Sequence, residues 1–257
     1  MGIVNVTPDS FSDGGRHLLR DAAIARAHQL IAEGADILDL GGESTRPGAQ
    51  AVSEQEELDR VLPVIEGLRG VDVPLSIDTC KPQVMRAAMA AGANIVNDIN
   101  ALQQPGALEA VAASDAAVCL MHKQGKPQTM QVAPQYQDVM SEVINFLRTR
   151  LATAEAAGIA KNRIMVDPGF GFGKSLEHNL ALLRNLHDFT ELKVPILAGL
   201  SRKSMLGALT GQDVDQRLAA SLAAALLAVQ HGASIVRVHD VQATVDALKI
   251  WNAVQKN

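Results

Sequence analysis

The sequence has few of the features that mark secreted, membrane-spanning or nucleic-acid-binding proteins. Its two cysteines, Cys80 and Cys119, are too few for a disulfide framework and form no CxxC pair that would hold zinc. A formal net charge of −5 gives no basic surface for nucleic acid or an anionic membrane. No apolar run reaches the roughly 18 residues of a membrane span, and residues 1–6 carry no charged leader. These absences predict a cytoplasmic protein that binds neither nucleic acid nor membranes.

The composition that remains is typical of a well-buried globular protein. Hydrophobic residues make up 47% of the 257 residues and charged residues 20%, which argues against disorder. This length is near the typical size of one (β/α)₈ barrel. Because the sequence contains no linker or low-complexity segment, we expect one domain over residues 1–257.

A weak internal repeat is the clearest sign of organisation along the chain. Residues 34–39 (GADILD) recur as residues 92–97 (GANIVN) and again as residues 232–237 (GASIVR). Each copy follows an Ala-rich helical stretch, has glycine where the helix would stop, and continues into a short apolar strand with a polar residue near its end. This order is typical of the step from helix to strand in a parallel sheet.

Eight apolar runs predict strands, with helical periodicity between them. Ser53 and Glu56 form a capping-box sequence ahead of one helical stripe, which Pro63 interrupts, so we expect a kink or a restart there. Eight βα units in a chain of this length predict an α/β fold, a single-domain (β/α)₈ TIM barrel, and a doubly wound open sheet is the alternative. The predicted strands are residues 3–6, 37–40, 75–77, 95–96, 117–121, 164–166, 196–198 and 235–238.

Three polar residues at predicted strand ends are candidates for ligand binding, because barrel sites form at the carboxyl ends of the strands. Asp78, Asn97 and Asp167 offer mainly hydrogen-bond acceptors. Such a set suits a planar heterocycle whose edge presents N–H donors. It would equally suit Mg²⁺, or local hydrogen bonds to backbone N–H groups, and the residues by themselves leave these readings open.

Cationic residues predict an anion site beside these acceptors. Barrel phosphate sites are frequently built from the loops after strands 7 and 8, and Arg and Lys bind anionic oxygens there. A surface ion-pair cluster is the alternative, but it is less favoured because Arg237 lies within a predicted strand. The loops supply Ser201, Arg202, Lys203, Arg237 and His239.

Aromatic residues are scarce, at 3%, yet Phe11, Phe170 and Phe172 all fall in predicted loops. Either they cover a flat ligand or they anchor the loops on the barrel rim, and the sequence favours neither. Residues 169–175 are similar to a phosphate-binding P-loop, but that pattern requires glycine where this chain has Pro168. We therefore expect no nucleotide hydrolysis.

Short motifs follow the predicted strands in order along nearly the whole chain. They are NVTPDSFSDGG (5–15), GGESTRPG (41–48), SIDT (76–79), ND (97–98), MH (121–122), DPGFGFGK (167–174), SRKS (201–204) and RVH (237–239). Together they closely resemble those of the dihydropteroate synthases, pterin-binding barrels of folate biosynthesis that sulfonamides target. The first two motifs are specific to that family. Related barrels that transfer methyl groups share the fold but are not expected to carry both.

The resemblance implies a transferase that condenses 6-hydroxymethyl-7,8-dihydropterin diphosphate with 4-aminobenzoate, giving 7,8-dihydropteroate and diphosphate. It implies a pterin site of Asp78, Asn97, Met121, Asp167 and Lys203. Asn5 would bind Mg²⁺ and, with Arg237 and His239, the diphosphate. The aminobenzoate site would consist of Thr45, Arg46, Pro47, Phe172 and Ser201. The residues implied to take part directly in catalysis are Asp78, Lys203 and Asn5.

Two further functions remain as alternatives: a corrinoid-linked pterin methyltransferase, and a non-catalytic pterin-binding homologue. The family resemblance also suggests a homodimer, whose face would include residues 218–229 and the last predicted helix, although burial against the barrel explains both equally well. The sequence departs from the family where Lys123 replaces a residue that is often apolar, and family members usually carry a further segment before the position of Met1.

Overall fold

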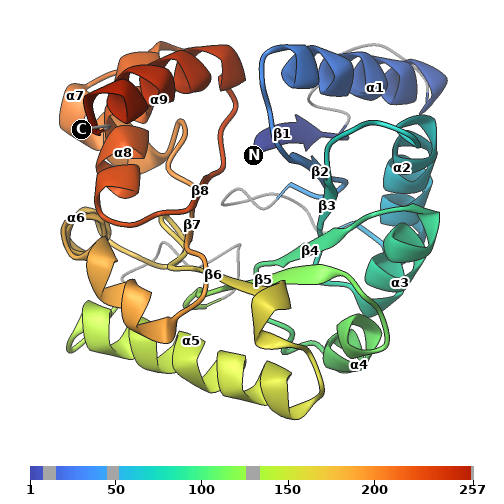
Figure 1. Cartoon of the computed structure of the whole chain (residues 1–257), viewed down its shortest axis with the longest axis horizontal. Coiled ribbons are helices and arrows are strands. Elements are labelled where there is room, and N and C mark those ends of the chain that lie inside the picture. Colours follow the sequence, from blue (N-terminus) through green and yellow to red (C-terminus); the bar gives the residue numbers. More distant parts are fainter. Residues whose placement is uncertain (8–15, 45–51, 126–133, 256–257) are drawn as a thin grey trace.

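The computed structural model describes residues 1–7, 16–44, 52–125 and 134–255. In these residues eight short strands surround a common centre and the helices lie outside them (Figure 1). The strands are β1 (Gly2–Asn5), β2 (Leu38–Gly41), β3 (Leu75–Asp78), β4 (Ile95–Asp98), β5 (Ala117–Met121), β6 (Ile164–Asp167), β7 (Leu197–Ala198) and β8 (Ile235–Val236). All eight predicted strands are therefore found, with ends that differ by up to two residues.

Helices connect the strands on the outside of the ring. The α-helices are α1 (Arg16–Ala32), α2 (Glu54–Gly67), α3 (Pro82–Ala91), α4 (Ala107–Ala112), α5 (Val139–Ala156), α6 (Leu176–Arg184), α7 (Ser204–Thr210), α8 (Leu218–Gln230) and α9 (Val241–Gln255). Short 3₁₀ helices are η2 (Lys161–Arg163), η3 (Leu186–Leu192) and η4 (Val214–Gln216). In the described part of the chain, none of these helices has both the length and the apolar character to cross a membrane.

The strand order is that of a TIM barrel. Strands β1 to β6 pair in sequence order as one parallel sheet, and β7 pairs with β8 in a second. Isolated parallel bridges, Val166 to Ile196 and Gly2 to Val238, connect β6 with the approach to β7 and the end of β8 with β1. The ladder is thus interrupted at two seams, but neighbours in sequence are neighbours around the ring. The doubly wound alternative is wrong, because such a sheet reverses its strand order.

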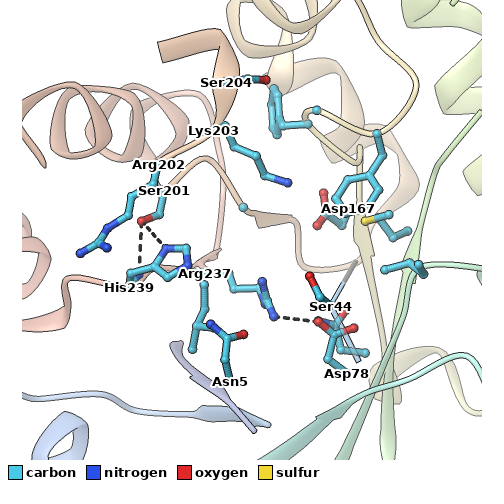
Figure 2. A pocket seen from close by; sticks show the side chains of 18 of the residues that line it. Asn5, Ser44, Asp78, Asp167, Ser201, Arg202, Lys203, Ser204, Arg237 and His239 are labelled. Carbon is cyan, nitrogen blue, oxygen red and sulfur yellow. Dashed lines mark hydrogen bonds and ion pairs between the residues drawn. The ribbon is translucent and has the colours of Figure 1, made fainter. Parts of the chain in front are cut away.

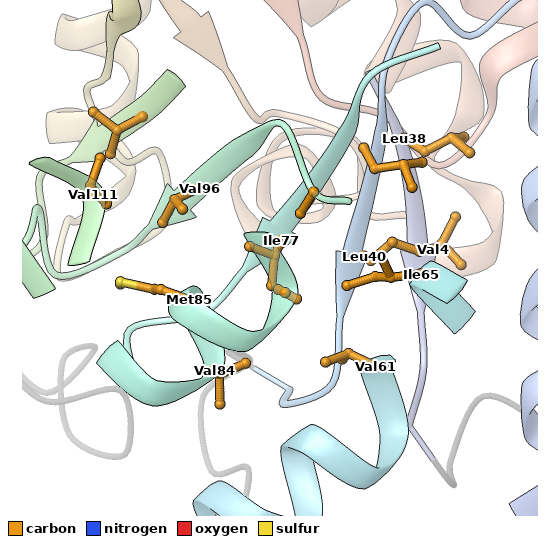
Figure 3. Packing of buried hydrophobic residues seen from close by; sticks show 14 of the residues in the cluster. Val4, Leu38, Leu40, Val61, Ile65, Ile77, Val84, Met85, Val96 and Val111 are labelled. Carbon is orange, nitrogen blue, oxygen red and sulfur yellow. The ribbon is translucent and has the colours of Figure 1, made fainter. Parts of the chain in front are cut away.

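Side chains alternate between the two faces of each strand. Outward-facing residues such as Val4, Leu38 and Ile77 pack against Ile65 of α2 and Met85 of α3 (Figure 3). Inward-facing apolar residues fill the amino-terminal end of the barrel as a separate cluster, formed by Met1, Ile95, Cys119, Met165 and Leu197. At the carboxyl ends of the strands the inward positions become polar, and this change creates the site.

Local signals explain where several helices begin or stop. Gly34, Gly92 and Gly232 all have positive φ, of 96°, 127° and 100°, which is the backbone conformation that glycine tolerates at a helix end. Ser53 caps α2 by accepting a hydrogen bond from the Glu56 N–H, as predicted. Helix α2, however, continues through Pro63 without a restart.

Candidate active site

A pocket of about 430 Å³ opens at the carboxyl ends of the strands (Figure 2). Thr45, Arg46, Pro47 and Phe11 lie outside the described residues, so the structure does not place them. Every other candidate lines this one pocket, namely Asn5, Asp78, Asn97, Met121, Asp167, Phe170, Phe172, Ser201, Arg202, Lys203, Arg237 and His239.

Strand register brings the polar residues together. In the parallel ladders Asn5 pairs with Gly41, Gly41 with Asp78, and Asp78 with Asn97, so the three polar residues lie at one level of the barrel. Asp167 is carried to the same end by its pairing with Met121. Asp78, Asn97 and Asp167 are part of the strands rather than the loops, because ladder hydrogen bonds involve only the backbone and do not end where the apolar side chains do.

Arg237 forms ion pairs with two aspartates. Its Nε donates to Asp39 Oδ2 at 2.5 Å. Its second terminal nitrogen donates to Asp78 Oδ2 at 2.8 Å (Figure 2). The sequence predicted an anion site here and disfavoured a surface ion-pair cluster. In the structure Arg237 lines the pocket and forms a partly buried ion pair with each aspartate, and the anion site stays a prediction. Asp78 Oδ1 is buried and has no donor among the described residues.

Burial shifts the pKa values of the charged groups in the pocket. Desolvation raises the pKa of Asp78 to about 7, although Arg237 acts to lower it. Desolvation also raises the pKa of Asp167, against hydrogen bonding from the Gly169 N–H, which lies 2.7 Å from Asp167 Oδ1. Lys203 and Asp167 both point into the pocket (Figure 2), and burial lowers the pKa of Lys203 to about 8. Shifts of this kind are common in functional sites.

Ser201 and His239 form a second polar contact at the pocket wall. Ser201 Oγ lies 2.9 Å from His239 Nδ1, and the His239 backbone N–H donates to the same hydroxyl at 3.2 Å. Arg202 also borders the pocket, and its guanidinium donates twice to Asp240, at 3.1 and 2.6 Å, so its charge is paired as that of Arg237 is.

The two described loop phenylalanines have different roles. Phe170 is fully buried in the cluster beneath α5 and α6 and anchors its loop. The ring of Phe172 borders the pocket, and Lys203 Nζ lies 4.2 Å from its centroid, a cation–π contact. Phe172 therefore offers a flat apolar surface to a ligand.

Two buried charged residues of the site were missed from the sequence. Asp39, with no exposed surface, accepts hydrogen bonds from Ser76 Oγ at 2.6 Å, Asn97 Nδ2 at 3.1 Å and Arg237. Its place at the end of the first repeat, matching Asn97 and Arg237 in the other two, was the available signal.

The second missed residue is Lys174. Its Nζ donates to the carbonyls of Gly169 at 2.8 Å and Phe172 at 3.0 Å, and it lies 3.0 Å from His122 Nδ1. Lys174 thus holds the turn that carries Phe172. Burial lowers the pKa of Lys174 to about 7. The sequence showed this lysine in the segment that is similar to a P-loop, but it did not predict that the side chain points into the protein.

Comparisons with known proteins agree with this geometry. The sequence profile of the pterin binding enzyme family matches residues 1–239. The dihydropteroate synthase of Haemophilus influenzae is 52% identical over 254 residues, covering 98% of this chain and 92% of that protein.

Two solved structures are similar over the whole chain. The dihydropteroate synthase of Xanthomonas albilineans with 4-aminobenzoic acid has a TM-score of 0.95 at 58% identity, covering 100% of this chain and 93% of that one. The Yersinia pestis enzyme with a sulfonamide drug complex has a TM-score of 0.95 at 51% identity, covering 100% and 94%. The chain therefore belongs to the pterin-binding enzyme family and, within it, to the dihydropteroate synthases.

Proposed function

We propose that this chain condenses 6-hydroxymethyl-7,8-dihydropterin diphosphate with 4-aminobenzoate to give 7,8-dihydropteroate and diphosphate. The observation that carries the proposal is one pocket that combines buried acceptors for a heterocycle, cations for an anion, and an aromatic surface. Membership of the dihydropteroate synthases supports the same reaction.

The pterin ring would occupy the side of the pocket formed by the acceptors. Asp78 Oδ1 is buried without a donor, and a ligand N–H would satisfy it. Asp167 uses one oxygen for the Gly169 N–H, which leaves the other for the ring. Asn97, Met121 and Lys203 complete this part of the site.

The diphosphate would lie at the cationic side, where Arg237 and His239 border the pocket. Among the described residues no group of three His, Cys, Asp or Glu side chains could hold a metal. Mg²⁺, however, usually takes one or two protein oxygens and fills its remaining positions with water and substrate phosphates. The side-chain oxygen of Asn5 fits such a site. When bound, the ion would neutralise negative charge on the leaving group.

The reaction would begin with cleavage of the C–O bond to diphosphate, which departs with the bonding electrons. The dihydropterin is electron-rich and spreads the positive charge left on its exocyclic carbon, and the Asp78 carboxylate stabilises that charge. The neutral amine of 4-aminobenzoate then forms the C–N bond and releases a proton. Phe172 and Ser201 would position the aminobenzoate, together with Thr45, Arg46 and Pro47.

Diphosphate release and product formation test this function together. We expect the wild-type protein to release diphosphate and form dihydropteroate, detected by mass spectrometry, only when both substrates are present. Lys203→Met should abolish most of this activity, whereas the control Lys249→Met, which changes an exposed lysine on α9, should not. Pterin binding without turnover would instead support the non-catalytic homologue, and methyl transfer to a corrinoid protein would support the methyltransferase.

The proposal also covers domain organisation and location. Residues 1–257 would form one domain, and the two cysteines, both free thiols, suit the cytoplasm.

The proposal further includes a homodimer. Its interface would use the exposed apolar side chains Leu218 and Leu227 of α8 and Ile250 of α9. Analytical ultracentrifugation should show a dimer that dissociates in Leu227→Glu. The control Leu18→Glu makes the same change at an exposed leucine of α1 and should leave the dimer intact.

A further inference from the structure

Equivalent positions of the three repeats meet inside the barrel. The sixth residue is Asp39 in the first copy, Asn97 in the second and Arg237 in the third. Asp39 Oδ2 accepts from both Asn97 Nδ2 and Arg237 Nε, and Asp39 Oδ1 accepts from Ser76 Oγ. A fully buried carboxylate with three donors is a satisfied group, and it is held in one orientation.

This contact fixes which way the Asn97 amide faces. A carboxylate only accepts hydrogen bonds, so the Nδ2 end of Asn97 must face Asp39. The opposite orientation would place two acceptors against each other inside the protein, which costs free energy because neither is solvated. Asn97 lines the pocket, and its Oδ1 is therefore the end turned away from Asp39. The residue adds an acceptor to those of Asp78 and Asp167.

The same carboxylate fixes Arg237. Its Nε is bound to Asp39 and its second terminal nitrogen to Asp78. Since the guanidinium is planar, these two contacts fix the orientation of its plane. The directions of its remaining N–H groups are then fixed as well. Asp39 itself has no exposed surface and does not line the pocket.

We propose that Asp39 is a positioning residue that sets the hydrogen-bonding character of the pterin site: it turns the Asn97 carbonyl toward the ligand and holds Arg237 against Asp78. This inference rests on the proposed function, because it assumes that the pterin edge meets Asn97. It selects ligands whose ring edge presents N–H donors and disfavours rings whose edge presents acceptors.

The first test is Asp39→Leu, which approximately keeps the size of the side chain and removes both acceptor oxygens. The KM for the pterin diphosphate should rise roughly tenfold to a hundredfold, as expected for losing a hydrogen bond to a charged group, with a smaller change in the KM for aminobenzoate. Ser76→Ala is the matched control, since it removes a donor to Asp39 without touching Asn97 or Arg237. It should change either KM by less than about threefold.

The second test restores a single acceptor. Asp39→Asn keeps one side-chain oxygen that can accept from both Asn97 and Arg237, because its NH₂ can face the Ser76 hydroxyl, which accepts. We expect Asp39→Asn to bind the pterin more tightly than Asp39→Leu. Equal loss for both substrates in Asp39→Leu, or pterin binding by Asp39→Asn no tighter than by Asp39→Leu when both fold normally by circular dichroism, would overturn the proposal.

A measurement on the wild-type protein does not depend on the folding of any variant. In the NMR spectrum of the unliganded protein, one Nδ2 proton of Asn97 should exchange slowly with solvent because it is bound to Asp39. Fast exchange of both protons would overturn the inference. If the wild-type protein released no diphosphate, the proposed function would fail instead, and this NMR result would still report on the Asp39 contact.

Discussion

Arg237 donates a hydrogen bond to Asp78 across 2.8 Å, so the cation assigned to the diphosphate contacts a carboxylate assigned to the pterin. The two parts of the proposed substrate site are therefore joined before any ligand binds. Arg237 acts to lower the pKa of Asp78. A diphosphate bound to Arg237 would therefore also change the pKa of Asp78.

Replacing Arg237 should weaken diphosphate binding more than pterin binding. Arg237→Ala should weaken binding of free diphosphate roughly tenfold to a hundredfold, and binding of a pterin without diphosphate much less. Isothermal titration measures the two affinities in each protein. Arg148→Ala, which changes an exposed arginine on α5 away from the pocket, is the control and should have little effect. Equal losses for the two ligands in Arg237→Ala would make Arg237 a purely structural residue.

Asp167→Asn should replace a favourable contact with the pterin by an unfavourable one. The oxygen of the new amide would accept from the Gly169 N–H, as Asp167 Oδ1 does, and its NH₂ would then face the N–H groups of the ring. We expect a loss of roughly 2–3 kcal/mol in pterin binding by calorimetry. Asp188→Asn, an exposed change in η3, is the control. Unchanged affinity in Asp167→Asn would remove Asp167 from the site.

The raised pKa of Asp78 should appear in the pH dependence of folding. Because this pKa is about 7 in the folded protein and 3.8 for an unperturbed aspartate, the folded state keeps the proton between those values while the unfolded state has lost it. The stabilising contribution is therefore present below the lower pKa and declines as pH rises toward 7. Urea unfolding across this range should show the decline in the difference between wild type and Asp78→Asn. A pH-independent difference would contradict the assigned shift.

Lys174 should give a pH dependence in a different range. Burial lowers its pKa from 10.5 to about 7, so between these values the unfolded state binds a proton that the folded state does not. Stability from this group therefore rises with pH across that interval. Thermal unfolding of wild type and Lys174→Met should diverge in favour of wild type as pH increases. Lys249→Met, at an exposed site, should show no such trend, and parallel curves for wild type and Lys174→Met would refute the lowered pKa of Lys174.

The contact between Ser201 and His239 predicts coupling between the two substrates. His239 is assigned to the diphosphate and Ser201 to aminobenzoate, and the two side chains lie 2.9 Å apart. Aminobenzoate should bind more tightly when Mg²⁺ and diphosphate are present, and diphosphate should gain affinity by the same factor. Titrations should show this coupling reduced in Ser201→Ala but not in Ser234→Ala. Identical aminobenzoate affinities with and without diphosphate would indicate independent sites.

The sequence by itself determined the elements and their order. Apolar runs, glycines at helix ends and the Ser53 cap act within a few residues, so the eight strands and several helix ends could be located without coordinates. The motifs likewise identified nearly all of the described pocket residues, because the carboxyl ends of parallel strands meet at one end of a barrel. Even the correct fold class followed, since the number and spacing of the βα units suit a ring.

Only the tertiary structure decided which of these side chains bind one another. The hydrogen bonds of Asp39 join it to Asn97, 58 residues away, and to Arg237, 198 residues away. Such contacts depend on strand register and on the closing of the ring, which no local pattern encodes. The same reason explains why Arg202 is paired with Asp240, why Phe170 is buried while Phe172 faces the pocket, and why Lys174 points inward. Local sequence determines the helices and strands, whereas packing between residues far apart in the sequence determines which side chains bind one another.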